Sequence, residues 1–148
     1  MKPNKSMFCV LLLTLICTAA TAQKIDNRQK LFAAYPQTVP LDAALISNTL
    51  NYEEGTTVSI PLSTEFTFTG TVISNAKKYD NLQTVMIRAA DNYTVFQISR
   101  ISNNDKSVLY AGRIININAA DGYEIKNNKG RYSLQKFETA RILQPCSL

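Results

Sequence analysis

The clearest pattern of hydrophobic and polar positions lies between residues 82 and 117. Three runs rich in valine, isoleucine, tyrosine and phenylalanine follow one another there, over residues 82–90, 93–102 and 107–117. The two breaks between them consist of turn-forming residues, mainly Asn and Asp. Runs of this composition, bounded by such residues, predict three consecutive strands joined by hairpins.

Apolar and polar residues also alternate upstream, over residues 58–62 and 66–68, which predicts two earlier strands. Pro61 cannot donate to a strand ladder, so the first of these strands is expected at a sheet edge. Gly70 is where a coiled sheet would bend sharply. The spacing of Leu41, Ala44 and Leu45 predicts a short helix that follows Pro40 and ends near residue 50.

Further short strand-like segments follow, at residues 123–126, 131–137 and 140–143. No strand–helix alternation is present, so a parallel sheet is not expected. The sequence therefore predicts a mainly β fold. We expect an antiparallel meander that forms a small barrel, roll or sandwich, with a short N-terminal helical or irregular segment.

The first 22 residues have the pattern of a secretory signal peptide. A positive start is followed by a short apolar run and by Ala20-Thr21-Ala22, a small-x-small cleavage site. We expect residues 1–22 to be removed, residues 23–40 to form a flexible leader or lie against the sheet, and residues 41–148 to form a single β domain. The domain is then secreted or periplasmic, with no membrane span in the mature chain. Lipid anchoring at Cys17 is a weaker alternative, because Ile16 precedes it.

Removal of the signal leaves Cys146 as the single cysteine of the mature chain. No internal disulfide is then possible, and an odd cysteine suggests intermolecular pairing or no role. The mature chain keeps 14 of its 16 basic residues against 11 acidic ones, a net charge of +3. This excess is spread along the chain, with no clustered basic stripe that would predict nucleic-acid binding.

Turn lengths give a register for the central strands. With a two-residue turn at 91–92, Ile87 lies opposite Phe96; with another at 104–105, Phe96 lies opposite Arg113. The inner face then carries Val85, Ile87, Ala89, Phe96, Ile98, Leu109, Ala111 and Ile115. The other face is unusually apolar for a solvent face, which predicts a covering layer, a curled sheet or a partner.

Four side chains are candidates for ligand binding. The register places Arg113 among apolar residues of the inner face, with Arg100 on the same face, so an anionic ligand could bind beside Phe96. The alternative is that both arginines lie at sheet ends and reach water or pair with Glu65 or Glu124. Tyr110 is the fourth, one of several strand tyrosines that suit either a contact surface or packing.

Several chemistries are excluded or disfavoured. The chain has no histidine, so it has no histidine-based triad or metal site, and a single mature cysteine excludes thiolate clusters. We expect no cofactor and no metal. Glu53, Glu54 and Glu65 could form a carboxylate pair of the kind that hydrolyses sugars, although solvated turns are the simpler interpretation. Asn92-Tyr93-Thr94 matches the glycosylation triplet, with no indication that it is used.

The sequence therefore predicts a secreted or periplasmic, non-catalytic domain that binds a protein, a glycan or a small ligand. One alternative is a structural or assembly component linked through Cys146, for example as a homodimer. The other is a carboxylate-dependent hydrolase.

Overall fold

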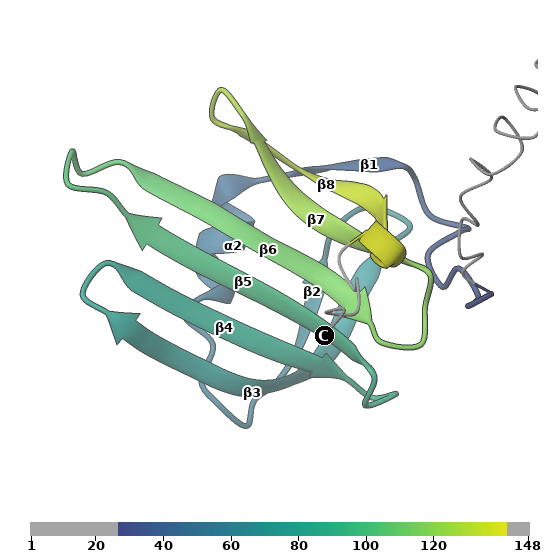
Figure 1. Cartoon of the computed structure of the whole chain (residues 1–148). Helices are drawn as coiled ribbons and strands as arrows, with labels where there is room; N and C mark the ends of the chain where they lie inside the picture. The colour runs from purple at the N-terminus through teal and green to yellow at the C-terminus, as the bar shows by residue number, and fades with distance from the viewer. Residues whose placement is uncertain (1–26, 142–148) are drawn as a thin grey trace, which may run out of the picture.

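The computed structural model describes residues 27–141, in which eight antiparallel strands form one curled half-barrel sheet with a single short α-helix (Figure 1). The elements in chain order are β1 (Thr38–Leu41), α2 (Ala43–Thr49), β2 (Thr57–Pro61), β3 (Thr67–Tyr79), β4 (Leu82–Ala89), β5 (Thr94–Ser102), β6 (Val108–Asn116), β7 (Asp121–Asn128), β8 (Arg131–Glu138) and the 3-10 turn η2 (Thr139–Arg141). The predicted mainly β, antiparallel meander is confirmed. The predicted signal peptide, Cys17 and Cys146 lie outside the described residues.

The strand order is β1-β8-β7-β6-β5-β4-β3-β2, so β1 and β2 are the two edges of the sheet. The edge position predicted for the strand with Pro61 is confirmed. Leu62 N donates to Phe66 O (2.9 Å), so Leu62 bonds to the neighbouring strand. Because hydrogen-bonded and non-bonded residues alternate along an antiparallel pair, the backbone nitrogen of Pro61 points away from β3, to the open side of the sheet. β1 carries Pro40 in the same way, opposite Ser133. A proline on each edge discourages unwanted strand pairing.

The short helix predicted after Pro40 is confirmed as α2. The Asp42 side chain caps it by accepting a hydrogen bond from Ala44 N (2.8 Å). Ile46 and Leu50 pack into the core on the inner face of the sheet. At the other end of the helix, Asn75 Nδ2 donates to the backbone oxygens of Leu50 (3.0 Å) and Tyr52 (2.8 Å). The helix is therefore held against the inner face of the sheet by both apolar and polar contacts.

The register of the first central hairpin is confirmed, with Ile87 opposite Phe96. The register predicted for the second hairpin is wrong by one residue, because Phe96 lies opposite Ile114 instead of Arg113. Asn103 N bonds to Ser107 O (2.8 Å), so the loop between them holds three residues, and Lys106 adopts a φ of 66°. A three-residue loop whose last residue is left-handed shifts the pairing by one, and this moves every β6 side chain to the opposite face.

Two smaller expectations are corrected. The register irregularities in β3 fall between Val72 and Ser74 and between Lys77 and Tyr79, not at Gly70. Gly70 is instead required by close packing, since an added Cβ would lie 2.5 Å from Arg88 O. The last predicted strand, at residues 140–143, is wrong in its described part, because residues 140 and 141 belong to η2, which follows β8.

The N-terminal segment, residues 28–37, lies against β7 and β8, and we call it the strap. Phe32 is 4% exposed and packs edge-on against Tyr123, with ring centroids 5.5 Å apart. β1 follows directly and pairs with β8. The packed domain therefore includes residues before 41, the position at which the sequence placed its start. Within residues 27–141 no helix has the length and apolar character needed to cross a membrane.

Candidate functional site

The four residues predicted to bind a ligand do not form one site. Phe96 is 1% exposed and packs against Phe68, with ring centroids 5.4 Å apart, so it belongs to the filled core. Arg113 is exposed on the outer face, and its predicted place among inner-face apolar residues is wrong because of the register shift. Arg100 and Tyr110 lie opposite each other on the inner face, near the hairpin end of β5 and β6. Phe96 and Arg113 face opposite sides of the sheet, so they do not line one cavity.

The predicted carboxylate pair is also not assembled. Glu53 and Glu54 precede β2, whereas Glu65 lies in the loop that follows it, and all three are exposed. The five residues of β2 separate them by roughly 17 Å at about 3.3 Å per residue. Across residues 27–141, no group of three acids, cysteines or histidines is placed to hold a metal ion.

A different site appears where β7 leaves β6. β5 and β6 pair over nine residue pairs, from Ser102↔Val108 to Thr94↔Asn116. β6 and β7 pair over only three, from Arg113↔Glu124 to Ile115↔Gly122. The β7–β8 hairpin then diverges from β6, as Figure 1 shows. We call this divergence the fork, and residues 108–112 of β6, which have no β7 partner in the described structure, its open edge.

The fork contains a shallow pocket of about 210 Å³ on the outer face, lined by Gln97, Ala111, Gly112, Arg113, Glu124 and Ile125. Gly112 lets the strands approach here, since an added Cβ would lie 2.4 Å from Gln97 O and 2.9 Å from Ile125 Cδ1. Any residue other than glycine at position 112 would therefore clash with these atoms.

An ion network borders this pocket. Arg113 donates to Glu124 Oε1 (2.9 Å) and Lys126 binds the other carboxylate oxygen. The hydrogen bond from Lys126, helped by that from Arg113, outweighs partial burial and holds the pKa of Glu124 below its usual range. Glu124 is therefore ionised at neutral pH and binds two cations, Arg113 and Lys126, at the base of the fork.

On the inner side of the fork a tyrosine replaces the missing strand partner. The Tyr132 hydroxyl accepts a hydrogen bond from Tyr110 N (3.3 Å) and another from Asn127 Nδ2 (3.2 Å). The two tyrosine rings pack edge-on, with centroids 5.5 Å apart. Tyr110 was a ligand-binding candidate from the sequence, and Tyr132 was another of the strand tyrosines. Glu124 was one of the alternative partners expected for the arginines, which its bond to Arg113 confirms. Their proximity depends on β8 and β7 folding back beside β6, which no local pattern indicates.

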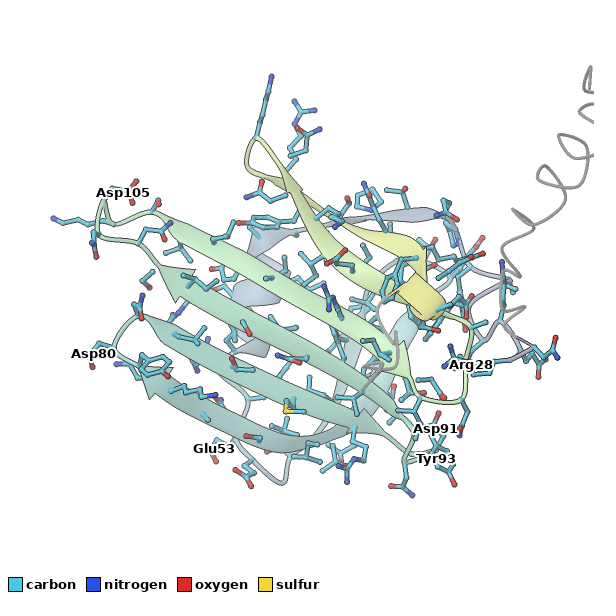
Figure 2. The ribbon with its side chains drawn as sticks, in the orientation of Figure 1. Arg28, Glu53, Asp80, Asp91, Tyr93 and Asp105 are labelled. Carbon is cyan, nitrogen blue, oxygen red and sulfur yellow. The ribbon has the colours of Figure 1, made fainter. Side chains whose placement is uncertain are left out.

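The outer face also carries an apolar row at one end of the sheet. The hairpin tips that hold Asp80 and Asp105 lie at this end, opposite the end that holds Asp91 and Tyr93 (Figure 2). Register pairs connect four apolar side chains across four strands there, and we call them the tip row: Tyr79, Leu82, Ile101 and Leu109. Tyr79 is 64% exposed and Leu109 37%. Row members nearer the middle are half-buried.

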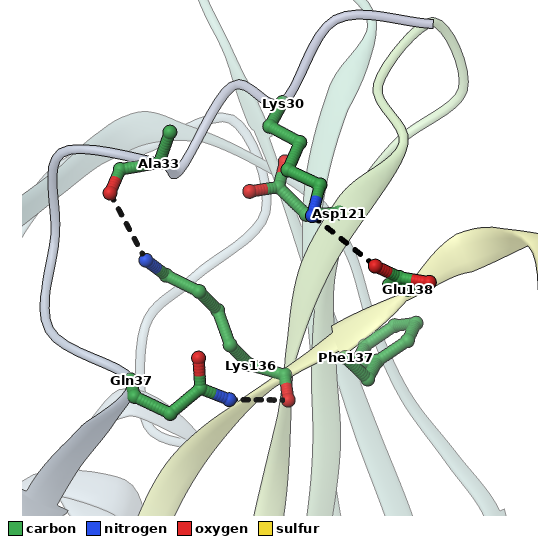
Figure 3. Close-up of a pocket in the computed structure, with 7 residues that line it drawn as sticks. All are labelled: Lys30, Ala33, Gln37, Asp121, Lys136, Phe137 and Glu138. Carbon is green, nitrogen blue, oxygen red and sulfur yellow. Dashed lines mark hydrogen bonds and ion pairs between the residues drawn. The ribbon is translucent and has the colours of Figure 1, made fainter. Parts of the chain in front are cut away.

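A larger pocket, of about 440 Å³, lies between the strap and β8 (Figure 3). Its charged groups hold the strap in place. Lys136 Nζ donates to the backbone oxygens of Tyr35 and Ala33, and the buried carboxylate of Asp121 accepts from Phe32 N (3.2 Å to each oxygen). Lys30 pairs with Glu138 at 3.1 Å. Since these groups already bind the chain itself, this pocket is better explained by attachment of the strap than by ligand binding.

Tyr123 also helps to hold the strap in place. Its hydroxyl donates to Pro36 O, and its ring lies 5.9 Å from Lys136 Nζ. Burial, followed by the nearby Asp121 carboxylate and Tyr35, raises the pKa of Tyr123 to about 12. The phenol therefore stays protonated at neutral pH and acts as a hydrogen-bond donor, not as a base.

No family model, curated protein or solved structure matches this chain.

Proposed function

We propose that this chain is an exported, non-catalytic β domain that acts by binding a partner protein with the outer face and tips of its sheet. The observation that carries the proposal is the contrast between a filled interior and the exposed tip row. Tyr79 on β3 and Leu109 on β6 are exposed at the two ends of this row, and the half-buried Leu82 and Ile101 join them into one apolar strip, as in surfaces that contact proteins. The signal-like pattern of residues 1–22 supports export.

A small-ligand or glycan function has less support. The inner face of the half-barrel is occupied by the core and by α2, including Phe96 and Ile98, each 1% exposed. The described pockets are shallow, and the largest is bordered by groups that hold the strap. A surface that only contacts another protein needs no catalytic groups, and the three glutamates considered for catalysis lie apart from one another in the described chain.

The test is site-specific photo-crosslinking in the cells that produce the protein. A photoreactive phenylalanine at position 109 is expected to give an adduct of one defined mass. The matched control places the same group at Ser59, which is exposed on the outer side of β2, and is expected to give none. Tyr79→Ser should weaken the adduct at 109 without lowering thermal stability by more than a degree or two. Equal adducts at both positions, or none at 109, would contradict the proposal.

A further inference from the structure

The open edge of β6 has the chemical features of a binding site for another strand. Asn103 N bonds to Ser107 O, so hydrogen-bonded pairs with β5 fall on the odd residues of β6. The backbone groups of Val108, Tyr110 and Gly112 therefore point the other way, into the fork. Tyr110 N, which donates to Tyr132 Oη on that side, confirms this direction.

These backbone groups lack the strand that would normally satisfy them. β7 pairs with β6 only from Arg113 onward, and within the described chain Tyr132 supplies one side-chain acceptor, at 3.3 Å. Backbone donors and acceptors at a strand edge are met by water or by another extended chain. The addition of a peptide strand to an exposed sheet edge is an established mode of recognition.

The charge around the fork indicates what kind of peptide fits. The β7–β8 hairpin carries three exposed cations, Lys126, Lys129 and Arg131, and Arg113 lies at the base of the fork. Between residues 122 and 137 of this hairpin Glu124 is the one acid, and it already binds Arg113 and Lys126. Asp121 and Glu138 lie at the other end of the hairpin, where they bind the strap. The open edge itself has no charged residue. A chain lying along it would have uncharged backbone contacts on one side and cations on the other.

We propose that the fork binds an extended, acidic peptide segment of a partner protein, which adds antiparallel to β6 along residues 108–111. Its acidic side chains face the cations of the β7–β8 hairpin, and its end lies near Gly112, where Ile125 closes the fork. When the peptide binds, one of its backbone carbonyl oxygens replaces the Tyr132 hydroxyl as the acceptor for Tyr110 N. This inference rests on the proposed function and specifies where the partner binds and what it must look like.

The experiment is an NMR titration of the whole mature domain with two synthetic peptides of about seven residues. One alternates glutamate with valine, and the other alternates lysine with valine. The acidic peptide is expected to shift the amide signals of Val108, Tyr110 and Gly112 and to bind at least about fivefold more tightly than the basic one. Binding of both peptides alike, or of neither, would overturn the proposal.

A matched pair of variants tests the backbone contact. Val108→Pro removes one N–H that points into the fork and leaves the bonds to β5 in place, whereas Val108→Thr keeps that N–H and changes only the side chain. Loss of one hydrogen bond predicts a three- to tenfold weaker affinity for the proline variant, and little change for threonine. Equal affinities in the two variants would count against strand addition.

A second pair tests the charge. Arg131→Glu on the hairpin is compared with Lys78→Glu at the β3–β4 tip, which changes the net charge by the same amount. Only the first is expected to weaken the acidic peptide, by about two- to fivefold, and more at low salt. If instead a single-stranded oligonucleotide shifts the hairpin signals while the acidic peptide leaves the β6 amides unmoved, the hairpin is a polyanion site and the strand proposal is wrong.

Failure here is distinguishable from failure of the proposed function. A photo-adduct at position 109 that persists in Val108→Pro and Arg131→Glu would keep the protein-binding function and reject the fork as its site.

Discussion

The inner and outer faces of β4, β5 and β6 are made by alternate residues of the same strands, yet they differ in what they do. On the inner face Val85, Ile87, Phe96, Ile98 and Ile114 are each at most 1% exposed. On the outer face an apolar tip row gives way, nearer the middle of the strands, to a row with the polar side chains Gln97, Arg113 and Glu124. The difference shows that one face holds the domain together, whereas the other is free to make contacts.

This comparison also explains why the ligand site expected from the sequence does not exist. Phe96 and Arg113 were expected to meet on one face, and the structure places them on opposite faces. A buried arginine would have been costly without a partner, and the exposed Arg113 avoids that cost by pairing with Glu124 in contact with water.

Phe96→Ala and Gln97→Ala change adjacent residues that face opposite sides of β5. Loss of a fully buried phenylalanine leaves a cavity and is expected to lower the free energy of unfolding by about 3–5 kcal/mol. The exposed Gln97 should change it by no more than about 0.5 kcal/mol. Urea unfolding followed by circular dichroism measures both. Similar losses in the two variants would mean that the outer face is covered in the folded protein.

Asn75→Ala removes a polar contact of the inner face, the amide that holds Leu50 O and Tyr52 O. Tyr52 O would lose its side-chain donor and Leu50 O one of two, since Gln83 Nε2 also donates to it (2.8 Å), so the change should cost about 1–3 kcal/mol. Ser59→Ala, which removes an exposed hydroxyl that lies 3.2 Å from that of Thr69, is the control and should be nearly neutral. An Asn75→Ala protein as stable as the control would show that α2 is held by its apolar residues alone.

Tyr132→Phe removes the hydroxyl that accepts from Tyr110 N at the fork. We expect a loss of about 1 kcal/mol, the usual net value of one hydrogen bond. The Tyr110 amide should also exchange with solvent faster, while that of Ile114, which pairs with Tyr123, should not. Unchanged exchange at Tyr110 would indicate that its N–H has another partner.

Arg113→Ala tests the outer position of this side chain directly. An exposed ion pair contributes about 0.2–1 kcal/mol, so the loss should fall in that range and diminish in high salt. A loss of several kcal/mol, comparable with that of Phe96→Ala, would instead indicate a buried arginine and the register that the sequence predicted.

The smallest effect is a pH dependence from Glu124. Its pKa is lowered in the folded state, so the contribution is present above the ordinary glutamate value, about 4.3, and is lost as the pH falls through the lower folded value. Glu124→Gln should therefore lower the stability slightly at neutral pH and flatten the acid side of the stability curve, with no change in its slope above neutral pH. Asp91, whose pKa is also lowered because hydrogen bonds from Thr94 outweigh its burial, contributes in the same direction and remains in the variant.

Features that are set by residues close together in the chain could be predicted from the sequence alone. The alternation of Val58 and Ile60 with polar residues, the turn formers after Ala89 and the missing N–H of Pro61 act within a few residues, so the strands, the first hairpin register and the edge strand were predictable. The antiparallel class followed from the short connections.

Tertiary structure decided everything that depends on a single dihedral angle or on distant partners. The positive φ of Lys106 shifted β6 by one residue and moved Arg113 to the outer face, a small local change that reverses a whole strand. The strap and the fork required β7 and β8 to return beside residues far away in the chain, so that Asp121 meets Phe32 and Tyr132 meets Tyr110. Local patterns carry no information about such long-range packing, because the same alternation fits any strand neighbour.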